Sequence, residues 1–212
     1  MKYIIMCGGT YHSWKWPRQL TDINGESVVG RTIRLLRENG VTDIAISSNN
    51  PIFEQFGIPV LKHENNYEAI GVRITGGDWF EAFYPTTEPT CYIFGDVVFS
   101  PEAIKTIVDT ETDTIEFFAS APPFAPEYPK PWAEPFALKV QNTDWLWDGI
   151  EEVRRLNALG VYWRKPIMWE LWSAITDFDP NLIDFTSYTA INDYTCDIDY
   201  PEDIQKIINF IV

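Results

Sequence analysis

The stretch that decides the fold is Lys2-Tyr3-Ile4-Ile5-Met6-Cys7-Gly8-Gly9. Its apolar first half is typical of a buried strand, and the glycine pair ends that strand. Glycines let a backbone approach a phosphate closely and turn several N–H donors toward it. A tight turn without any ligand explains this loop equally well, because it matches neither a Walker loop nor G-x-G-x-x-G.

The residues that follow this loop alternate between helix and strand patterns. Ser27 is placed to cap a helix that runs to about Asn39, and residues 43–47 form a second strand-like run, followed by a shorter one at 58–61. A strand, a helix and a strand in such close succession form a βαβ unit, which favours a parallel sheet. We therefore expect an α/β protein.

The rest of the chain continues this alternation. Strands are predicted at residues 91–94, 115–119, 136–140 and 194–197. Helices are predicted at residues 76–83, 143–159 and 167–175. Two more are predicted to begin at Pro101, which follows the capping Ser100, and at Pro201. The proline-rich segment, residues 121–135, is predicted to be a rigid extended loop. It is either a boundary between two halves of the chain or a lid.

Composition and charge limit the classes of partner. The chain has 212 residues, of which 45% are hydrophobic and 22% charged, and its net charge is −15. No basic face is visible, so the sequence argues against a nucleic-acid partner. The same acidity repels phosphates at long range. Any phosphate chemistry must therefore be supported locally by metal ions, backbone N–H groups and a few placed cations.

Several further classes are disfavoured. No apolar run approaches the roughly 20 residues of a membrane helix, and the first residues do not resemble a signal peptide, so we expect a cytoplasmic protein without a membrane partner. Cys7, Cys91 and Cys196 are widely spaced and lack a C-x-x-C pattern, which argues against a disulfide framework or a zinc cluster. We expect Cys7 and Cys91 to be small buried residues.

Asp96 follows the predicted strand at residues 91–94. In open α/β sheets, ligands bind at the carboxyl ends of the strands. A carboxylate there can hold Mg²⁺, which prefers a few carboxylates together with substrate phosphates. The alternative is an aspartate in an ordinary turn, since Gly-Asp is common in turns.

A second acidic segment lies near residue 200. Asp197 and Asp199 are two positions apart, so they share a face if the segment is extended. Two carboxylates on one face repel each other unless a cation lies between them. The alternative is that Asp199 caps the helix that begins at Pro201, and the two aspartates can have different roles.

Taken together, these segments resemble the nucleotidyltransferases of the glycosyltransferase-A-type fold. That superfamily includes sugar-phosphate nucleotidyltransferases, cytidylyltransferases and molybdenum-cofactor guanylyltransferases. The segments that match keep their order over nearly the whole chain: residues 4–9, 17–20, 23–29, 94–97 and 197–203. The resemblance implies a Rossmann-like three-layer sandwich with a mostly parallel mixed sheet. It also implies one domain over residues 1–212, with a nucleotide-binding half (1–120) and an acceptor half that ends in the metal segment (121–212).

The resemblance implies a Mg²⁺-dependent enzyme that moves an NMP group from an NTP to a sugar phosphate or an alcohol phosphate and releases pyrophosphate. Catalysis of this kind rests mostly on positioning and charge neutralisation. The implied catalytic residues are Arg18, Lys15 and Asp96, and the implied metal ligands are Asp96, Asp197 and Asp199. The implied nucleotide-binding residues are Cys7, Gly8, Gly9, Thr10 and Gly76.

Two departures from the family pattern keep alternatives open. The loop lacks the second glycine and the arginine of G-x-G-x-R, and Arg18 stands where the family has lysine. A non-catalytic nucleotide-binding protein of the same fold would explain the altered loop. A glycosyltransferase that uses a nucleotide-sugar is disfavoured, because Gly95-Asp96-Val97-Val98 lacks the Asp-x-Asp expected there.

Substrates and assembly are less constrained by the sequence. We favour CTP as the nucleotide, on the resemblance to the cytidylyltransferases, and a homodimer is left open. Trp132 and Glu134, with Trp169 and Trp172, either form the wall of an acceptor pocket or pack locally as aromatic groups do.

Overall fold

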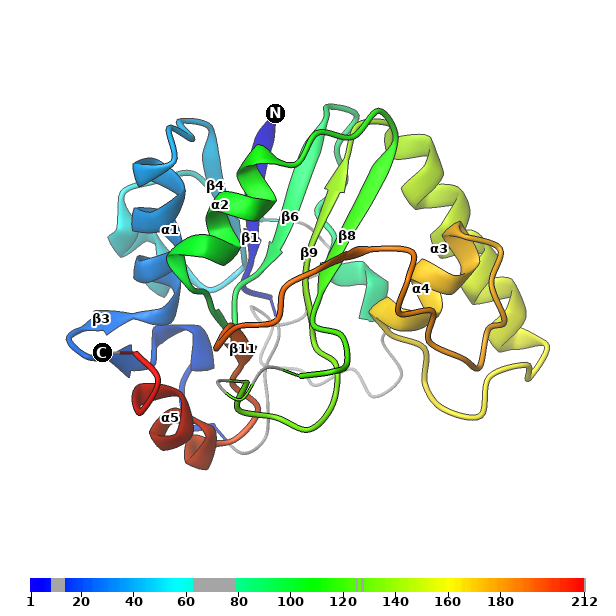
Figure 1. Cartoon of the computed structure of the whole chain (residues 1–212). Helices are drawn as coiled ribbons and strands as arrows, with labels where there is room; N and C mark the ends of the chain where they lie inside the picture. The colour runs from blue at the N-terminus through cyan, green and yellow to red at the C-terminus, as the bar shows by residue number, and fades with distance from the viewer. Residues whose placement is uncertain (9–13, 63–78, 125, 127, 212) are drawn as a thin grey trace.

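The computed structural model describes residues 1–8, 14–62, 79–124, 126 and 128–211 (Figure 1). Its main sheet has seven strands in the order β10-β8-β9-β6-β1-β4-β5. Their bounds are β1 Lys2–Met6, β4 Ile44–Ser47, β5 Val60–Leu61, β6 Thr90–Phe94, β8 Ile115–Ala119, β9 Pro135–Val140 and β10 Thr189–Ala190. β9 runs antiparallel to both β6 and β8, and the other paired strands are parallel. The predicted mixed, mostly parallel sheet is thus confirmed.

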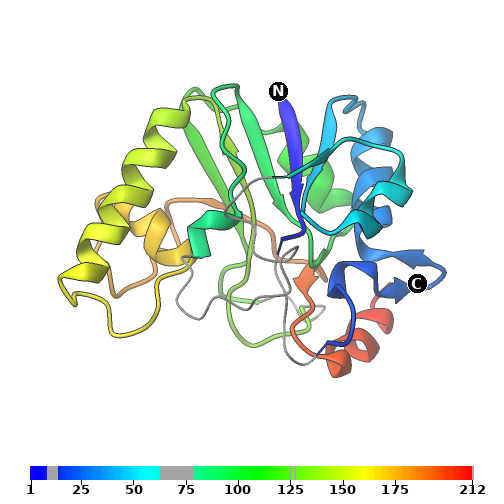
Figure 2. The same cartoon turned by 180° about the vertical axis from the view of Figure 1, so that it is seen from behind.

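Helices cover both faces of this sheet. Their bounds are α1 Val28–Glu38, α2 Pro101–Asp109, α3 Thr143–Ala158, α4 Met168–Ile175 and α5 Pro201–Ile208, with 3₁₀ helices η1 Arg18–Leu20, η2 Pro51–Phe56 and η4 Trp79–Ala82. α1 and α2 lie in front of the sheet in Figure 1, whereas α3 and η4 are nearest the viewer from behind (Figure 2). The three-layer arrangement of the α/β fold is therefore present.

Local sequence explains where the helices begin. The Ser27 hydroxyl accepts the N–H of Gly30, and the Ser100 hydroxyl accepts the N–H of Ala103. Such N-terminal caps satisfy a backbone donor that would otherwise be unpaired. Both predicted caps are confirmed. Of the helix predicted at 76–83, the described part is the 3₁₀ helix η4.

Two short antiparallel pairs lie outside the main sheet. β2 (Asp22–Ile23) pairs with β3 (Glu26–Ser27), and β7 (Val97–Val98) pairs with β11 (Cys196–Asp197). The strand predicted at residues 194–197 is therefore shorter than expected, and it does not join the main sheet. Its pairing with β7 carries the C-terminal segment to the carboxyl end of β6 (Figure 1).

The core lies around the central strands. Ile4 and Ile5 of β1 and Cys91 and Tyr92 of β6 are fully buried. Cys7 and Cys196 are also buried, and all three cysteines are free, as expected for cysteines used as small apolar residues. Within the described residues, no helix is both long and apolar enough to cross a membrane.

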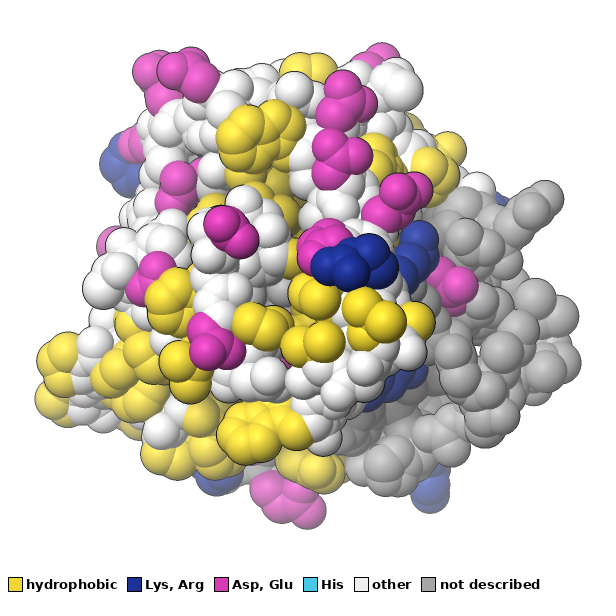
Figure 3. All heavy atoms as spheres, turned by 90° about the vertical axis from the view of Figure 1, so that its right-hand side faces the viewer, with side chains coloured by type: hydrophobic (Ala, Val, Ile, Leu, Met, Phe, Trp, Pro, Cys, Tyr) yellow, Lys and Arg dark blue, Asp and Glu magenta, His cyan; other side chains and the backbone are white. Residues whose placement is uncertain are grey.

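The end of the molecule that carries α3 and α4 exposes apolar side chains. Trp163 is 81% exposed, Leu159 65% and Leu182 57%. Figure 3 shows apolar groups gathered on this face.

The predicted boundary between the two halves of the chain, at residues 120 and 121, lies between β8 and β9. These two strands are neighbours in the same sheet, so both halves contribute strands to it. The division into halves stays a prediction.

Candidate active site

A cavity of about 380 Å³ lies where the parallel strands β1 and β6 end. Its described lining combines charged groups with a largely apolar wall: Met6, Gly8, Arg18, Gln19, Trp79, Ala82, Phe94, Asp96, Trp132, Ala133, Glu134, Pro135, Arg164, Ile167, Met168, Trp169, Asp197 and Asp199. This is the edge at which open α/β sheets bind ligands.

Gly95 fixes the position of Asp96 at this edge. A Cβ at residue 95 would lie 2.5 Å from the Met6 carbonyl oxygen and 2.6 Å from the Cys7 Sγ atom. The Gly95 N–H donates to the same Met6 carbonyl at 3.0 Å. Only glycine permits this approach, which places Asp96 beside the end of β1 and the glycine loop. Asp96 therefore lies in a turn and also faces the cavity, so the two interpretations of it are compatible.

The C-terminal segment is joined to Asp96 by its backbone. After the β7–β11 pair, the Ile198 N–H donates to the Asp96 carbonyl oxygen at 2.9 Å. This contact brings Asp197 and Asp199 to the cavity beside Asp96. The alternative role of Asp199 as a helix cap is wrong. Tyr200 is the N-cap of α5, and the Asp203 carboxylate accepts the N–H groups of Asp199 and Tyr200.

Arg18, in η1, links the two acidic segments. Its guanidinium forms an ion pair with Asp96, and its Nη1 lies 3.0 Å from Asp199 Oδ1 and 2.9 Å from the Ile198 carbonyl oxygen. Burial alone would lower the pKa of Arg18, but Asp96 and Asp199 outweigh it and raise that pKa. Arg18 is therefore a fixed positive charge between the predicted metal ligands.

A second cation, Lys130, comes from the proline-rich segment. Its side chain is only 3% exposed, and its ammonium pairs with Asp197, with Asp199 Oδ2 at 3.3 Å and with Glu134 Oε1 at 3.4 Å. Burial works to lower the pKa of Lys130, but Asp197 and Glu134 raise it overall. Lys130 thus stays protonated inside a group of carboxylates.

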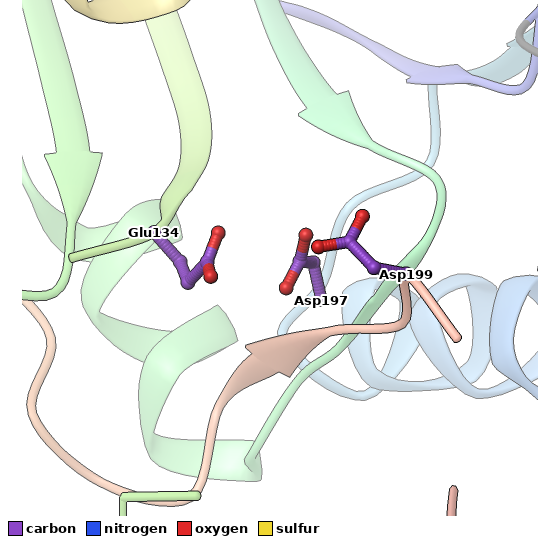
Figure 4. Close-up of side chains that lie close together, drawn as sticks. All are labelled: Glu134, Asp197 and Asp199. Atoms are coloured by element: carbon purple, nitrogen blue, oxygen red, sulfur yellow. The ribbon is translucent and has the colours of Figure 1, made fainter. Parts of the chain in front are cut away.

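Three carboxylates around Lys130 point toward one another (Figure 4). One oxygen each of Glu134, Asp197 and Asp199 lies within 4.8 Å of the others. Burial raises the pKa of Glu134 to about 7 and, together with the Glu134 charge, raises the pKa of Asp197 well above its usual value. Burial also acts to raise the pKa of Asp199, but Lys130 and Arg18 hold it below its usual value.

The charge balance of this group fits a divalent cation. When all four are ionised, Asp96, Asp197, Asp199 and Glu134 carry four negative charges, and Arg18 and Lys130 supply two positive ones, which leaves two negative charges uncompensated. Burial is the first cause of the raised pKa values of Glu134 and Asp197, and a bound cation would favour their ionised forms. Carboxylate oxygens are also the ligands that Mg²⁺ prefers.

Known structures resemble the whole chain. They include a glucose-1-phosphate thymidylyltransferase from Bacillus anthracis described as putative (TM-score 0.60, 12% identity, 98% of this chain and 94% of that one). Also similar is a CTP:phosphocholine cytidylyltransferase from Streptococcus pneumoniae, with a TM-score of 0.53, 12% identity, and coverage of 100% of this chain and 99% of that one. An inositol-1-phosphate CTP transferase from T. maritima has a TM-score of 0.53, 15% identity, and coverage of 99% of this chain and 95% of that one. No protein-family model and no curated protein sequence matches the chain.

The chain has the fold of these structures. Its similarity to these structures extends over nearly their full lengths, although few residues are identical. The resemblance predicted from short segments spread over nearly the whole sequence thus agrees with a similarity in fold that also covers nearly the whole chain.

Within this fold, some of the predicted site residues line the cavity and others do not. Arg18, Asp96, Asp197, Asp199 and Gly8 line one cavity. Of the others, Cys7 is buried behind Gly8 and its N–H donates to the Ser47 carbonyl oxygen. Lys15 is exposed and is not among the described lining residues. Gly9, Thr10 and Gly76 lie outside the described residues.

Three of the four residues considered for a pocket wall line the cavity, and an acceptor there stays a prediction. Trp132, Glu134 and Trp169 line the cavity, and the Trp132 indole N–H donates to Glu134. Trp172 does not line it and instead donates to the Ser187 hydroxyl at 2.8 Å.

Sequence reasoning missed two polar residues that line the cavity, Gln19 and Arg164. It also missed Lys130, which is buried against the carboxylates of Glu134 and Asp197. Arg164 is held by Glu170, whose buried Oε1 atom accepts its Nε at 2.7 Å. Lys130 lies between two prolines in a segment without periodicity. Nothing in that local pattern indicates that a lysine there turns inward, so only the excess of acidic residues could have suggested a buried cation.

Proposed function

We propose that this chain is a Mg²⁺-dependent nucleotidyltransferase that moves an NMP group from an NTP to a sugar phosphate or an alcohol phosphate. The observation that carries the proposal is the meeting of Asp96 with Asp197 and Asp199 at the carboxyl ends of β1 and β6. With Glu134, these carboxylates carry two more negative charges than Arg18 and Lys130 balance, which suits one divalent cation, and the edge is where a nucleotide would bind. The resemblance in fold supports the same reaction class.

Six residues that line the cavity would have a role in this reaction. Asp96 and Asp199 would hold the metal, with Asp197 and Glu134 nearby, and the bound ion would neutralise charge on the triphosphate. Gly8 lets the backbone approach the phosphates. Arg18 supplies a fork of N–H donors, which suits a phosphate, once the nucleotide is bound.

The bonds change in a single in-line displacement. An oxygen of the acceptor phosphate attacks the α-phosphorus of the NTP, and the bond from that phosphorus to the bridging oxygen breaks. Pyrophosphate leaves with the electron pair, and the nucleotide is joined to the acceptor. No protein nucleophile is required, because positioning and charge neutralisation supply the catalysis.

The proposal also names the nucleotide and its further contacts. We infer CTP as the nucleotide, Lys15 as a further cation near the triphosphate, and the loop residues Gly9 and Thr10 with Gly76 as nucleotide contacts. A cytoplasmic location and a homodimer complete the proposal. Cell fractionation tests the location, and sedimentation velocity tests the dimer.

The experiment that tests the reaction measures pyrophosphate release. Each of the four NTPs is combined with Mg²⁺ and a panel of sugar and alcohol phosphates. We expect release with one nucleotide and one acceptor class, and we expect Asp96→Asn to slow it by about a hundredfold or more, as loss of a charge-stabilising group does. Asp148→Asn, an exposed change on α3, is the matched control and should leave the rate unchanged.

Other results would favour the alternatives. Silence over the panel, with no thermal shift from any NTP, would contradict the proposal. Tighter binding of a nucleoside diphosphate-sugar than of any NTP would indicate a glycosyltransferase. Mg²⁺-NTP binding that survives Asp96→Ala, without turnover in the wild type, would indicate a non-catalytic protein.

A further inference from the structure

Arg18 is bound to the same carboxylates that would hold the metal. Its guanidinium pairs with Asp96 Oδ2 and with Asp199 Oδ1, and it donates to the Ile198 carbonyl oxygen. Asp199 Oδ2 lies 3.3 Å from Lys130, so both oxygens of Asp199 already have a positively charged partner. The two carboxylates are therefore engaged before any ligand binds.

A metal ion and this guanidinium cannot share the site unchanged. Mg²⁺ binds oxygen ligands at about 2.0–2.1 Å in a nearly ideal octahedron, so an ion held by Asp96 and Asp199 would lie close to the guanidinium that pairs with the same two carboxylates. The guanidinium and the ion are also like charges, which repel strongly at short range in a partly buried site. Arg18, Asp96 and Asp199 have side chains that are only 16%, 18% and 30% exposed.

Lys130 differs from Arg18 in this respect. Its ammonium contacts Glu134 and Asp197 in addition to Asp199, and its side chain is almost fully buried. Removing it from the cluster would leave the buried carboxylates of Asp197 and Glu134 without their cationic partner, which is strongly unfavourable. Arg18 itself lines the cavity, as do its carboxylate partners Asp96 and Asp199, so it is the cation that can turn toward a ligand there.

We propose that Arg18 and the divalent cation compete for Asp96 and Asp199, and that Arg18 leaves these carboxylates when metal and nucleotide enter together. The released guanidinium then binds the phosphates, which replace the lost partners. Without a nucleotide it has no such partner, so the metal alone binds weakly. The inference rests on the proposed function only for the identity of the metal and the anion.

The competition predicts opposite effects of one substitution. Arg18→Gln removes the competing charge, so we expect its affinity for Mn²⁺ alone, measured by electron paramagnetic resonance without nucleotide, to be at least tenfold tighter than in the wild type. The same variant loses a phosphate ligand. We therefore expect at least tenfold weaker binding of a non-hydrolysable NTP analogue at saturating Mg²⁺.

A purely structural role for Arg18 would give a different result, because a loosened site would weaken both affinities. Equal or weaker Mn²⁺ binding by a folded Arg18→Gln variant overturns the proposal. Arg37→Gln is the matched control, since Arg37 is an exposed arginine on α1 outside the described cavity lining. It removes the same charge and should leave both affinities unchanged.

A second variant covers the case in which Arg18→Gln does not fold. Arg18→Lys keeps the charge but cannot span Asp96, Asp199 and the Ile198 carbonyl together. We expect it to tighten Mn²⁺ binding by a smaller factor, about threefold, and no tightening in this variant overturns the proposal. Thermal denaturation of each variant verifies that it is folded.

The two proposals fail in distinguishable ways. Tighter Mn²⁺ binding by Arg18→Gln in a protein that turns over no NTP would contradict the proposed function alone. Turnover by the wild type with unchanged Mn²⁺ affinity in Arg18→Gln would contradict the competition alone.

Discussion

At the scale of single residues, Lys130 is the group whose removal should be most costly. It neutralises Asp197, Asp199 and Glu134, which otherwise repel one another in a partly buried place. Breaking a buried ion pair from one side usually costs about 3–5 kcal/mol, because the remaining charge is left without compensation. The positive charge of Lys130 therefore supports the fold as well as the site.

We expect Lys130→Met to lower the free energy of unfolding by about 3 kcal/mol in urea denaturation without metal. Added Mg²⁺ should restore more stability to this variant than to the wild type, because the ion replaces the missing charge. Lys105→Met is the matched control. Lys105 pairs with Asp109 on the exposed face of α2, where such a pair contributes only about 0.3–0.5 kcal/mol.

An equal loss in the two variants would contradict this account of Lys130. So would a Lys130→Met variant whose stability does not respond to Mg²⁺ beyond the wild-type response.

The sequence was sufficient to predict some of the site residues and not others. Asp96 follows a strand with a clear apolar pattern, so its place at the sheet edge could be predicted. The spacing of Asp197 and Asp199 indicated a shared face, and the cavity contains both. Lys130 comes from a proline-rich segment without a hydrophobic periodicity, so the direction of its side chain depends on tertiary packing alone. For Glu134 in the same segment, the sequence left a place in the pocket wall open.

At the scale of elements, helices and strands were predictable where local chemistry decides them. The caps at Ser27 and Ser100 and the apolar run of β6 were sufficient. The antiparallel direction of β9 and the pairing of β11 with β7 could not be predicted, because a strand's partner depends on distant residues. The C-terminal segment reaches the site only through that pairing.

Ile198 anchors this segment, since its side chain is fully buried and its N–H donates to the Asp96 carbonyl oxygen. We expect Ile198→Ala to lower the free energy of unfolding by about 2–4 kcal/mol through the cavity it leaves. Because Asp197 and Asp199 flank this residue, Mg²⁺-nucleotide binding should also weaken, by about tenfold or more as positioning effects do. Isothermal titration calorimetry measures the affinity.

Ile104→Ala is the control for this change. Ile104 lies on α2 and is equally buried, but it is not among the described residues that line the cavity. It should cost similar stability and leave the nucleotide affinity unchanged. Equal weakening of binding in both variants would show that stability, and not the β7–β11 connection, controls affinity.

At the scale of the whole molecule, the net charge of −15 opposes an anionic nucleotide at long range. Salt should therefore accelerate association instead of slowing it. Between about 0.01 M and 0.15 M salt the Debye length falls from about 30 Å to about 8 Å. We expect the association rate constant of a fluorescent NTP analogue, measured by stopped flow, to rise about two- to fivefold over this range.

An uncharged osmolyte at matched osmolality is the control and should leave the rate constant unchanged. A rate constant that falls with salt would mean that Arg18 and Arg164, the cations that line the described cavity, set the potential there, and that the total charge has little influence.

The pairing of β7 with β11 also determines when, during synthesis of the chain, the residues of the site come together. Arg18 and Asp199 are separated by 181 positions. At about 5–20 residues per second, a ribosome needs roughly 10 to 35 s to reach Asp199 after it has added Arg18. Most strands of the sheet are synthesised in that interval, while Asp96 still lacks its C-terminal neighbours. An unfinished chain therefore lacks the complete carboxylate cluster, which forms only when the segment around Asp199 emerges and folds back onto β7.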